Sequence, residues 1–210
     1  MFEVMCFGDS NTWGYSASTG DRYPRSVRWT GVLQASLGSD FLVIEEGLNG
    51  RTTVWEDPVE GDKAGKRHLL PCLQSHAPLD LVILMLGTND LKKRFSAPPC
   101  DIAAGAGVLM DIIQASNAGR GGSAPALLLL APPPLAATST TAFGGMFAGG
   151  AEKSWELGKL YKEAAHIRNC PFIDTGAIIR SSEIDGIHLE EKEHRVLGEA
   201  VAQEVRRLAR

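Results

Sequence analysis

Residues 79–90 read LDLVILMLGTND, an apolar run that ends in a glycine and three polar residues. The run is continuously hydrophobic over most of its length rather than alternating, which is typical of a parallel strand buried on both faces. We therefore predict a strand over residues 79–86. Four other short runs have the same character and are also predicted to be strands: 2–7, 41–45, 126–131 and 172–174.

Helical patterns lie between these strands. They cover residues 28–37, 66–76, 101–117, 152–169 and 190–208. Pro71 is expected to mark a helix start or a kink in the second of them. The repeated strand–helix–strand units predict an α/β fold, with one parallel sheet of about five strands sandwiched between helices. No repeat or linker divides the chain, so we expect residues 1–210 to form a single domain.

The composition narrows the range of partners. The chain has 210 residues, of which 44% are apolar and 22% charged, and its net charge is −4. This charge gives no reason to expect a nucleic acid or an anionic membrane as a partner. No apolar run approaches the roughly 20 residues of a transmembrane helix. The first residues also lack the basic segment of a signal peptide.

The four cysteines, Cys6, Cys72, Cys100 and Cys170, are dispersed and have no metal-ligand spacing. We interpret them as reduced, mostly buried thiols. Such thiols indicate a reducing compartment, so we expect a cytoplasmic protein.

Ser10 follows the first predicted strand through the turn Gly8-Asp9. Ligands of parallel α/β sheets bind at the carboxyl ends of strands, and a serine there is a candidate nucleophile if a base lies beside it. A serine in this position is also a common helix N-cap, so Ser10 alone indicates either role.

The sequence Asp185-Gly186-Ile187-His188 offers that base. His188 follows a glycine-containing loop, and Asp185 can reach its Nδ1, fix the tautomer and stabilise the imidazolium. The alternative is that Asp185 is a turn residue, since Asp-Gly is a strong turn signal. The other histidines occur in polar helical contexts, and we expect all of them at the surface: His68, His76, His166 and His194.

Three hydrogen-bond donors are candidates for an oxyanion hole: the backbone N–H groups of Ser10 and Gly50 and the side-chain amide of Asn89. The alternative is that the Asn49-Gly50 and Gly87-Thr88 pairs only form turns. Asp9 and Asp90 are expected to hold loops through hydrogen bonds to backbone N–H groups.

Four motifs resemble, in order, the four blocks of the SGNH (GDSL-type) hydrolase family: residues 8–10, 47–50, 87–90 and 185–188. The resemblance extends over nearly the whole chain. It implies a flavodoxin-like three-layer fold and ester hydrolysis without a metal or another cofactor. It also implies that Ser10 is the nucleophile, that His188 is general base and acid oriented by Asp185, and that Ser10, Gly50 and Asn89 form the oxyanion hole.

Within this family, residues 28–30, 45–48, 51–53 and 85–90 resemble the bacterial arylesterase and acyltransferase subgroup. That resemblance implies short acyl esters as substrates, acyl transfer to alcohols or peroxide as well as to water, and a homo-oligomer. One residue departs from the family pattern. Asn11 follows the serine where the family usually has leucine, which changes the polarity expected near Ser10.

Aromatic residues after two of the motifs are candidates to bind the substrate. Trp13, Tyr15 and Trp55 would line an aromatic pocket, and Asn11 lies next to Ser10. The alternative for the aromatic residues is a place in the core or in a subunit interface.

Two segments are predicted to be loops, residues 57–66 and 131–150. The second contains Phe143, Met146 and Phe147, which are costly to leave in water. We expect them to cover the active site or to pack against another subunit.

The function that these residues favour is hydrolysis of a small short-chain aryl or alkyl ester through a Ser–His–Asp triad and an acyl-enzyme. A carbohydrate acetylesterase of the same family uses the same triad and stays open as an alternative. A non-catalytic flavodoxin-like nucleotide-binding module would need a glycine-rich phosphate cradle after the first strand. Residues 8–12 instead offer one glycine and an acidic residue, which repels phosphate.

Overall fold

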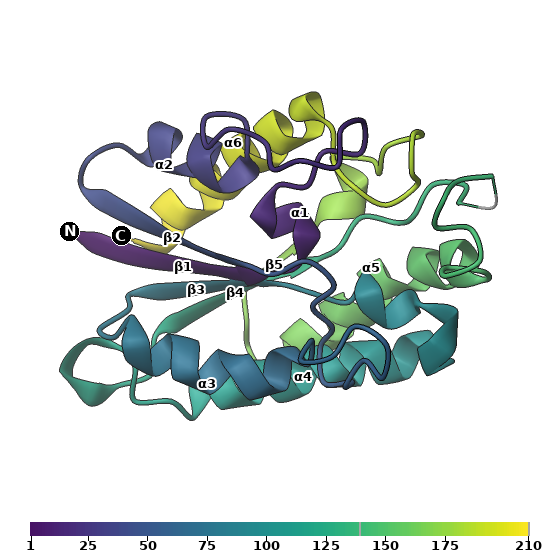
Figure 1. Cartoon of the computed structure of the whole chain (residues 1–210). Coiled ribbons are helices and arrows are strands. Elements are labelled where there is room, and N and C mark those ends of the chain that lie inside the picture. The colour runs from purple at the N-terminus through teal and green to yellow at the C-terminus, as the bar shows by residue number, and fades with distance from the viewer. Residues whose placement is uncertain (139, 210) are drawn as a thin grey trace.

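The computed structural model describes residues 1–138 and 140–209. It contains a sheet of five parallel strands in the order β2-β1-β3-β4-β5 (Figure 1). The strands are β1 (Phe2–Gly8), β2 (Phe41–Gly47), β3 (Leu81–Met85), β4 (Ala126–Ala131) and β5 (Phe172–Asp174). The predicted α/β class with a parallel sheet is confirmed.

Helices cover both faces of this sheet (Figure 1). One face carries α2 (Trp29–Leu37) and α6 (Glu191–Leu208), and the other carries α3 (Gly65–Ser75), α4 (Pro99–Gln114) and α5 (Gly150–Ile167). A short helix, α1 (Ser10–Trp13), follows β1 directly. Within the described part of the chain, every helix is too short or too polar to cross a membrane.

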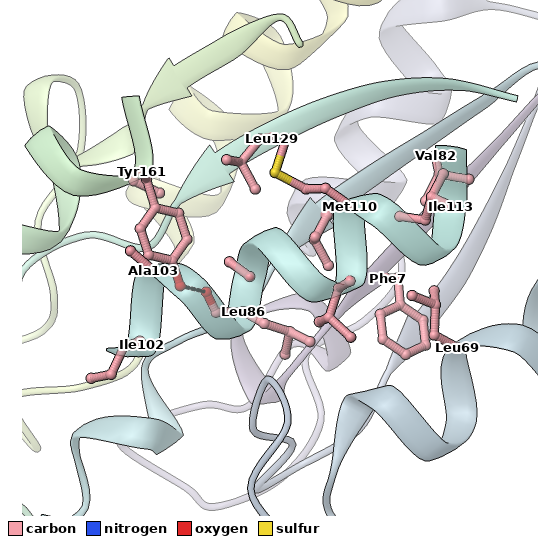
Figure 2. Packing of buried hydrophobic residues seen from close by; sticks show 14 of the residues in the cluster. Phe7, Leu69, Val82, Leu86, Ile102, Ala103, Met110, Ile113, Leu129 and Tyr161 are labelled. Carbon is pink, nitrogen blue, oxygen red and sulfur yellow. Dashed lines mark hydrogen bonds between the residues drawn. The ribbon is translucent and has the colours of Figure 1, made fainter. Parts of the chain in front are cut away.

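The core has two halves, one on each face of the sheet. Successive side chains of a strand point to opposite faces of the sheet. Cys6 therefore packs on the face covered by α2 and α6, and Phe7 packs on the face covered by α3, α4 and α5. Figure 2 shows part of the second half, where the hydroxyl of Tyr161 donates to the carbonyl oxygen of Leu86 at 2.8 Å. Burial on both faces explains why the strands appear in the sequence as unbroken apolar runs.

Some boundaries differ from the prediction. The strand predicted over residues 79–86 is shorter, because the N–H of Leu79 donates to the carbonyl oxygen of Ala118 at 2.7 Å, before the ladder of β3 begins. Pro71 lies in the interior of α3, so it marks no helix start. Leu69 and Leu73 of this helix are fully buried, and their packing offsets the backbone hydrogen bond that proline removes.

The expectation that His194 lies at the surface is wrong. Its side chain is buried between α6 and α2, and its Nδ1 accepts a hydrogen bond from the N–H of Trp29 at 3.2 Å. Burial, with a smaller contribution from the nearby charges of His188 and Arg28, lowers the pKa of His194 to about 4. The expectation of mostly buried thiols is also wrong, because Cys6 is buried, Cys72 and Cys170 are partly buried and Cys100 is exposed.

Candidate active site

Ser10 is the first residue of α1, directly after the end of β1. Asp9 caps this helix, since its Oδ1 accepts the N–H of Asn11 at 3.0 Å. Ser10 is therefore not the N-cap. A Cβ added at Gly8 would lie 2.0 Å from Oγ1 of Thr12, so the close approach of α1 to β1 requires glycine there. The Asp9 carboxylate also occupies an N–H group that a phosphate would need, which disfavours the nucleotide-binding alternative.

Ser10, His188 and Asp185 form a continuous chain of contacts. Oγ of Ser10 lies 2.9 Å from Nε2 of His188, and Nδ1 of His188 lies 2.5 Å from Oδ2 of Asp185. All three side chains are buried. Burial raises the pKa of Asp185, but the hydrogen bond and charge of His188 and two backbone N–H groups outweigh it, so the pKa falls below its usual value. This geometry allows His188 to remove the proton of Ser10 while Asp185 stabilises the imidazolium.

Asn11 connects the helix of Ser10 to the loop of His188. Its Oδ1 accepts the N–H of Leu189 at 3.0 Å, and its Nδ2 donates to the carbonyl oxygen of Ile187 at 3.4 Å. The side chain is almost fully buried and satisfied by these groups. Asn11, which was expected to bind the substrate, does not line the cavity.

The three predicted oxyanion donors, Ser10, Gly50 and Asn89, line one cavity. Asn89 Nδ2 donates one hydrogen to the carbonyl oxygen of Arg51 at 3.1 Å, which leaves its second hydrogen for a ligand. Gly50 has φ of +81°, a left-handed conformation that favours glycine.

Buried charged side chains join the loops that carry these donors. Nη1 of Arg51 donates to the carbonyl oxygen of Gly8 at 2.9 Å and also to that of Glu46. Both carboxylate oxygens of Asp90 accept the N–H of Thr53 at 3.0 Å. The ends of β1, β2 and β3 are therefore fixed relative to one another. As predicted, Asp9 and Asp90 hold loops through backbone N–H groups.

Asp9 and Asp90 are also the two carboxyl groups near the site whose pKa values are raised. Burial raises the pKa of Asp9 to about 6, against the opposing effects of the Asn11 N–H and His188. Burial likewise raises the pKa of Asp90 to about 7, although Thr53 opposes the rise. Neither carboxylate lies among the residues that line the cavity.

The cavity has a volume of about 460 Å³ and two chemically different sides. The apolar side consists of Tyr15, Phe143, Met146, Phe147 and Ile187, and the polar side consists of Asn49, Glu60, Lys63 and Lys92. The ring of Tyr15 is centred 4.2 Å from that of His188, and the ring of Phe143 is 6.1 Å away. The expectation that the loop of Phe143 covers the site agrees with this position.

Two predicted substrate-binding residues do not line the cavity. Trp13 packs beside Tyr15, with the guanidinium of Arg22 over its ring at 5.1 Å. Trp55 packs against the hydrophobic core. Trp55 therefore follows the core alternative that the sequence left open, whereas Trp13 belongs to neither half of the core.

The three charged residues on the polar side of the cavity, Glu60, Lys63 and Lys92, were not predicted from the sequence. Glu60 and Lys63 belong to the charged segment 57–66, and Lys92 follows the Asn89 motif by three residues. Only the folding of that segment over the sheet edge brings them together, and no local pattern marks it. Among residues 1–138 and 140–209, no group of three or more His, Cys, Asp or Glu side chains is arranged to hold a metal ion.

The chain matches the model of the GDSL-like Lipase/Acylhydrolase family over residues 6–196. It is 44% identical to the native aryl esterase of M. smegmatis, with a TM-score of 0.94 over 99% of this chain and 100% of that chain. It is 45% identical to Est24, a carbohydrate acetylesterase from Sinorhizobium meliloti, with a TM-score of 0.95 over the same shares of the two chains. The search of curated proteins gives no match.

Proposed function

We propose a substrate range and a mechanism for this chain, which belongs to the GDSL-like lipase/acylhydrolase (SGNH) family and is an aryl-esterase-like carboxylic ester hydrolase. It hydrolyses small esters of short acyl groups through an acyl-enzyme. The observation that carries the proposal is the contact of Ser10 with His188 at 2.9 Å, on the wall of the cavity described above.

In the first half of the reaction, Oγ of Ser10 attacks the ester carbonyl carbon while Nε2 of His188 takes the hydroxyl proton. Asp185 holds the other ring nitrogen and stabilises the imidazolium. The negative charge on the carbonyl oxygen is stabilised by the N–H groups of Ser10 and Gly50 and by the amide of Asn89. His188 then gives its proton to the departing alcohol oxygen, and the acyl group stays on Ser10.

In the second half, water attacks the acyl-enzyme. His188 takes a proton from the water and returns it to Oγ of Ser10, so that the acid is released and the enzyme is regenerated. An alcohol or peroxide that attacks instead of water yields a new ester or a peracid. The apolar side of the cavity supports this transfer, because Phe143, Met146 and Ile187 lower the local concentration of water.

A carbohydrate acetylesterase is the second candidate. The polar side of the cavity favours it, since Asn49, Glu60, Lys63 and Lys92 offer hydrogen-bond partners to a hydroxylated leaving group. The 45% identity to Est24 supports this candidate as strongly as the 44% identity to the M. smegmatis aryl esterase supports the first one.

Rates with p-nitrophenyl acetate, p-nitrophenyl octanoate and an acetylated sugar test the proposal. We expect the acetate to be turned over much faster than the octanoate, because the covered cavity limits chain length. A sugar acetate that is hydrolysed far faster than the aryl acetate would favour the second candidate. Failure to hydrolyse any of the three would contradict both.

We further propose that the protein is cytoplasmic and that it forms a homo-oligomer. Its support is four free cysteines and two large apolar side chains of the loop, Phe143 and Met146, that are only partly covered within one chain. Phe147, in contrast, is buried within its own chain and needs no neighbouring subunit.

A further inference from the structure

One side of the cavity carries an ion-pair cluster formed by two acids and two bases. Nζ of Lys92 lies 2.6 Å from Glu60 and 3.4 Å from Asp57, and Nη1 of Arg94 lies 2.8 Å from Asp57 and 3.7 Å from Glu60. Asp57 and Lys92 are almost fully buried. The two negative and two positive charges cancel formally within the cluster.

Lys63 adds a fifth charge to this side of the cavity, and it is not balanced. Within the described residues, its ammonium group has no carboxylate partner at ion-pairing distance. Its side chain is half-buried and runs beside Gly50, since a Cβ added at Gly50 would lie 3.4 Å from Cε of Lys63. A net positive charge therefore lies next to a proposed oxyanion donor.

The other charges near the site do not neutralise Lys63. The carboxylate of Asp185 lies behind the imidazole of His188 and does not line the cavity. Oε2 of Glu60 also lies close to Gly50, but the carboxylate of Glu60 already pairs with Lys92.

Asn49 is a second unsatisfied group on the same side. Its Oδ1 is buried and has no hydrogen-bond partner in residues 1–138 and 140–209. A buried amide without a partner is costly unless a ligand or water satisfies it, and a carboxamide can turn to present either its oxygen or its NH₂ group.

We propose that Lys63 and Asn49 form a subsite for a carboxylate group of the ester substrate, so that the enzyme prefers acidic esters over neutral ones of the same shape. The inference rests on the proposed esterase function and names a substrate class for it. Lys63 binds the carboxylate by charge, and the Asn49 amide donates to it after turning its NH₂ group into the place now held by Oδ1. The carboxylate belongs either to the acyl part or to the alcohol part of the ester.

The test is a ratio of kcat/KM values for an acidic ester and its neutral methyl ester. One arm compares 4-acetoxybenzoate with methyl 4-acetoxybenzoate, which places the carboxylate on the alcohol part. The other arm compares the monophenyl ester of succinic acid with methyl phenyl succinate, which places it on the acyl part. Ser10→Ala protein serves as the blank for uncatalysed hydrolysis. In one of the two arms, kcat/KM for the acidic ester should exceed kcat/KM for its neutral methyl ester. That arm identifies whether the carboxylate belongs to the acyl part or to the alcohol part of the substrate.

In that arm, Lys63→Met should lower the ratio about two- to fivefold, the range of one partly exposed ion pair. Lys63→Glu should lower it further, and Lys63→Arg should keep it. Added salt should lower the wild-type ratio toward the Lys63→Met value, because the interaction is screened. Lys66→Met, an exposed lysine outside the cavity, is the matched control and should keep the wild-type ratio.

Because each ratio compares two substrates of one variant, general damage to the protein cancels. Equal ratios in wild-type, Lys63→Met and Lys63→Glu proteins in both arms would overturn the inference while leaving the esterase function intact. Hydrolysis by Ser10→Ala protein at nearly the wild-type rate would instead contradict the proposed mechanism.

Discussion

The backbone N–H of Leu189 donates to Oδ1 of Asn11 at 3.0 Å, and this bond connects the His188 loop to the helix that begins with Ser10. The neighbours of His188 on both sides contact Asn11, since the carbonyl oxygen of Ile187 accepts from its Nδ2. Leucine, the residue expected here by resemblance to the family, can form neither bond.

Asn11→Leu should therefore misplace His188 relative to Ser10. We expect kcat to fall by about 10- to 100-fold, the effect of a small displacement of a reacting group. The free energy of unfolding should fall by about 1–3 kcal/mol, because the buried N–H of Leu189 loses its acceptor. Asn11→Asp keeps the acceptor and should retain more activity than Asn11→Leu. Steady-state kinetics and urea denaturation measure the two effects. Unchanged kcat in Asn11→Leu protein would show that leucine packing positions the loop equally well.

Ser10→Ala should remove the nucleophile and lower turnover of a short aryl ester by on the order of 10³-fold or more. The fold should be intact by circular dichroism, because the hydroxyl contributes only its contact with His188 at the start of α1. A serine-reactive phosphonate should label Ser10, as identified by mass spectrometry of the peptide. Ser18→Ala, at an exposed position nearby, is the control. Most of the activity remaining in Ser10→Ala protein would refute the assignment.

His188→Ala should be nearly as damaging as Ser10→Ala, and the double variant hardly worse, because the groups act as a unit. Asp185→Asn should also lower kcat, since it leaves the wrong imidazole tautomer. The control is His166→Ala on the exposed side of α5. Additive losses in the double variant, measured as kcat/KM, would argue against a shared mechanism.

The buried His194 predicts a pH dependence of stability. Its pKa is lowered to about 4 in the folded chain, against about 6.5 in the unfolded chain. The stability that it contributes is therefore fully present above about pH 6.5 and is lost as the pH falls from there to about 4. His194→Asn, which retains an acceptor for Trp29, should lose less stability than wild type between about pH 7 and pH 5.

Urea midpoints at the two pH values give this comparison. Asp9 and Asp90, with raised pKa values of about 6 and about 7, act in the opposite direction, but they are present in both proteins and cancel. Parallel pH profiles for the two proteins would mean that His194 is charged or solvated in the folded chain.

Phe143→Ala should widen the acyl-chain tolerance, because its ring covers the cavity 6.1 Å from that of His188. We expect the rate with an octanoate ester, relative to the acetate, to rise several-fold. Trp155→Ala, on an exposed face of α5 outside this cavity, should leave the ratio unchanged. Light scattering of the same variant tests whether the loop also joins subunits. An unchanged ratio would mean that another group limits chain length.

The strands and helices were predictable because a sheet buried on both faces produces unbroken apolar runs, and all five strands lie within two residues of the predicted limits. Ser10 and Asn89 could be placed together because both follow parallel strands, whose carboxyl ends share one edge. Lys63 could not be placed, because its position depends on how an irregular segment folds over that edge.

His194 is a different case, since the sequence contained a signal for it. It precedes Leu197 by three residues and Val201 by seven, so it shares the buried stripe of α6. Because histidine is polar, it was not counted in the periodic pattern of apolar residues. The roles of Trp13 and Trp55 had no such signal, because isolated aromatic residues occur in cores and pockets alike.

The hydrogen bonds that Arg51 and Asp90 form with neighbouring loops have a consequence for protein engineering. They fix the loops after β1, β2 and β3 through charged side chains, whereas the apolar side of the cavity is formed in part by the uncharged side chains of Phe143, Met146 and Phe147. The side chains of Phe143 and Met146, which are only partly buried, can thus be exchanged without breaking these hydrogen bonds, whereas Ala136 has to stay in place because its N–H donates to the carbonyl oxygen of Gly186 in the His188 loop at 2.9 Å. Evolution and design can therefore diversify the substrates of this scaffold by exchanging these two side chains, while Ser10, His188 and Asp185 stay in place.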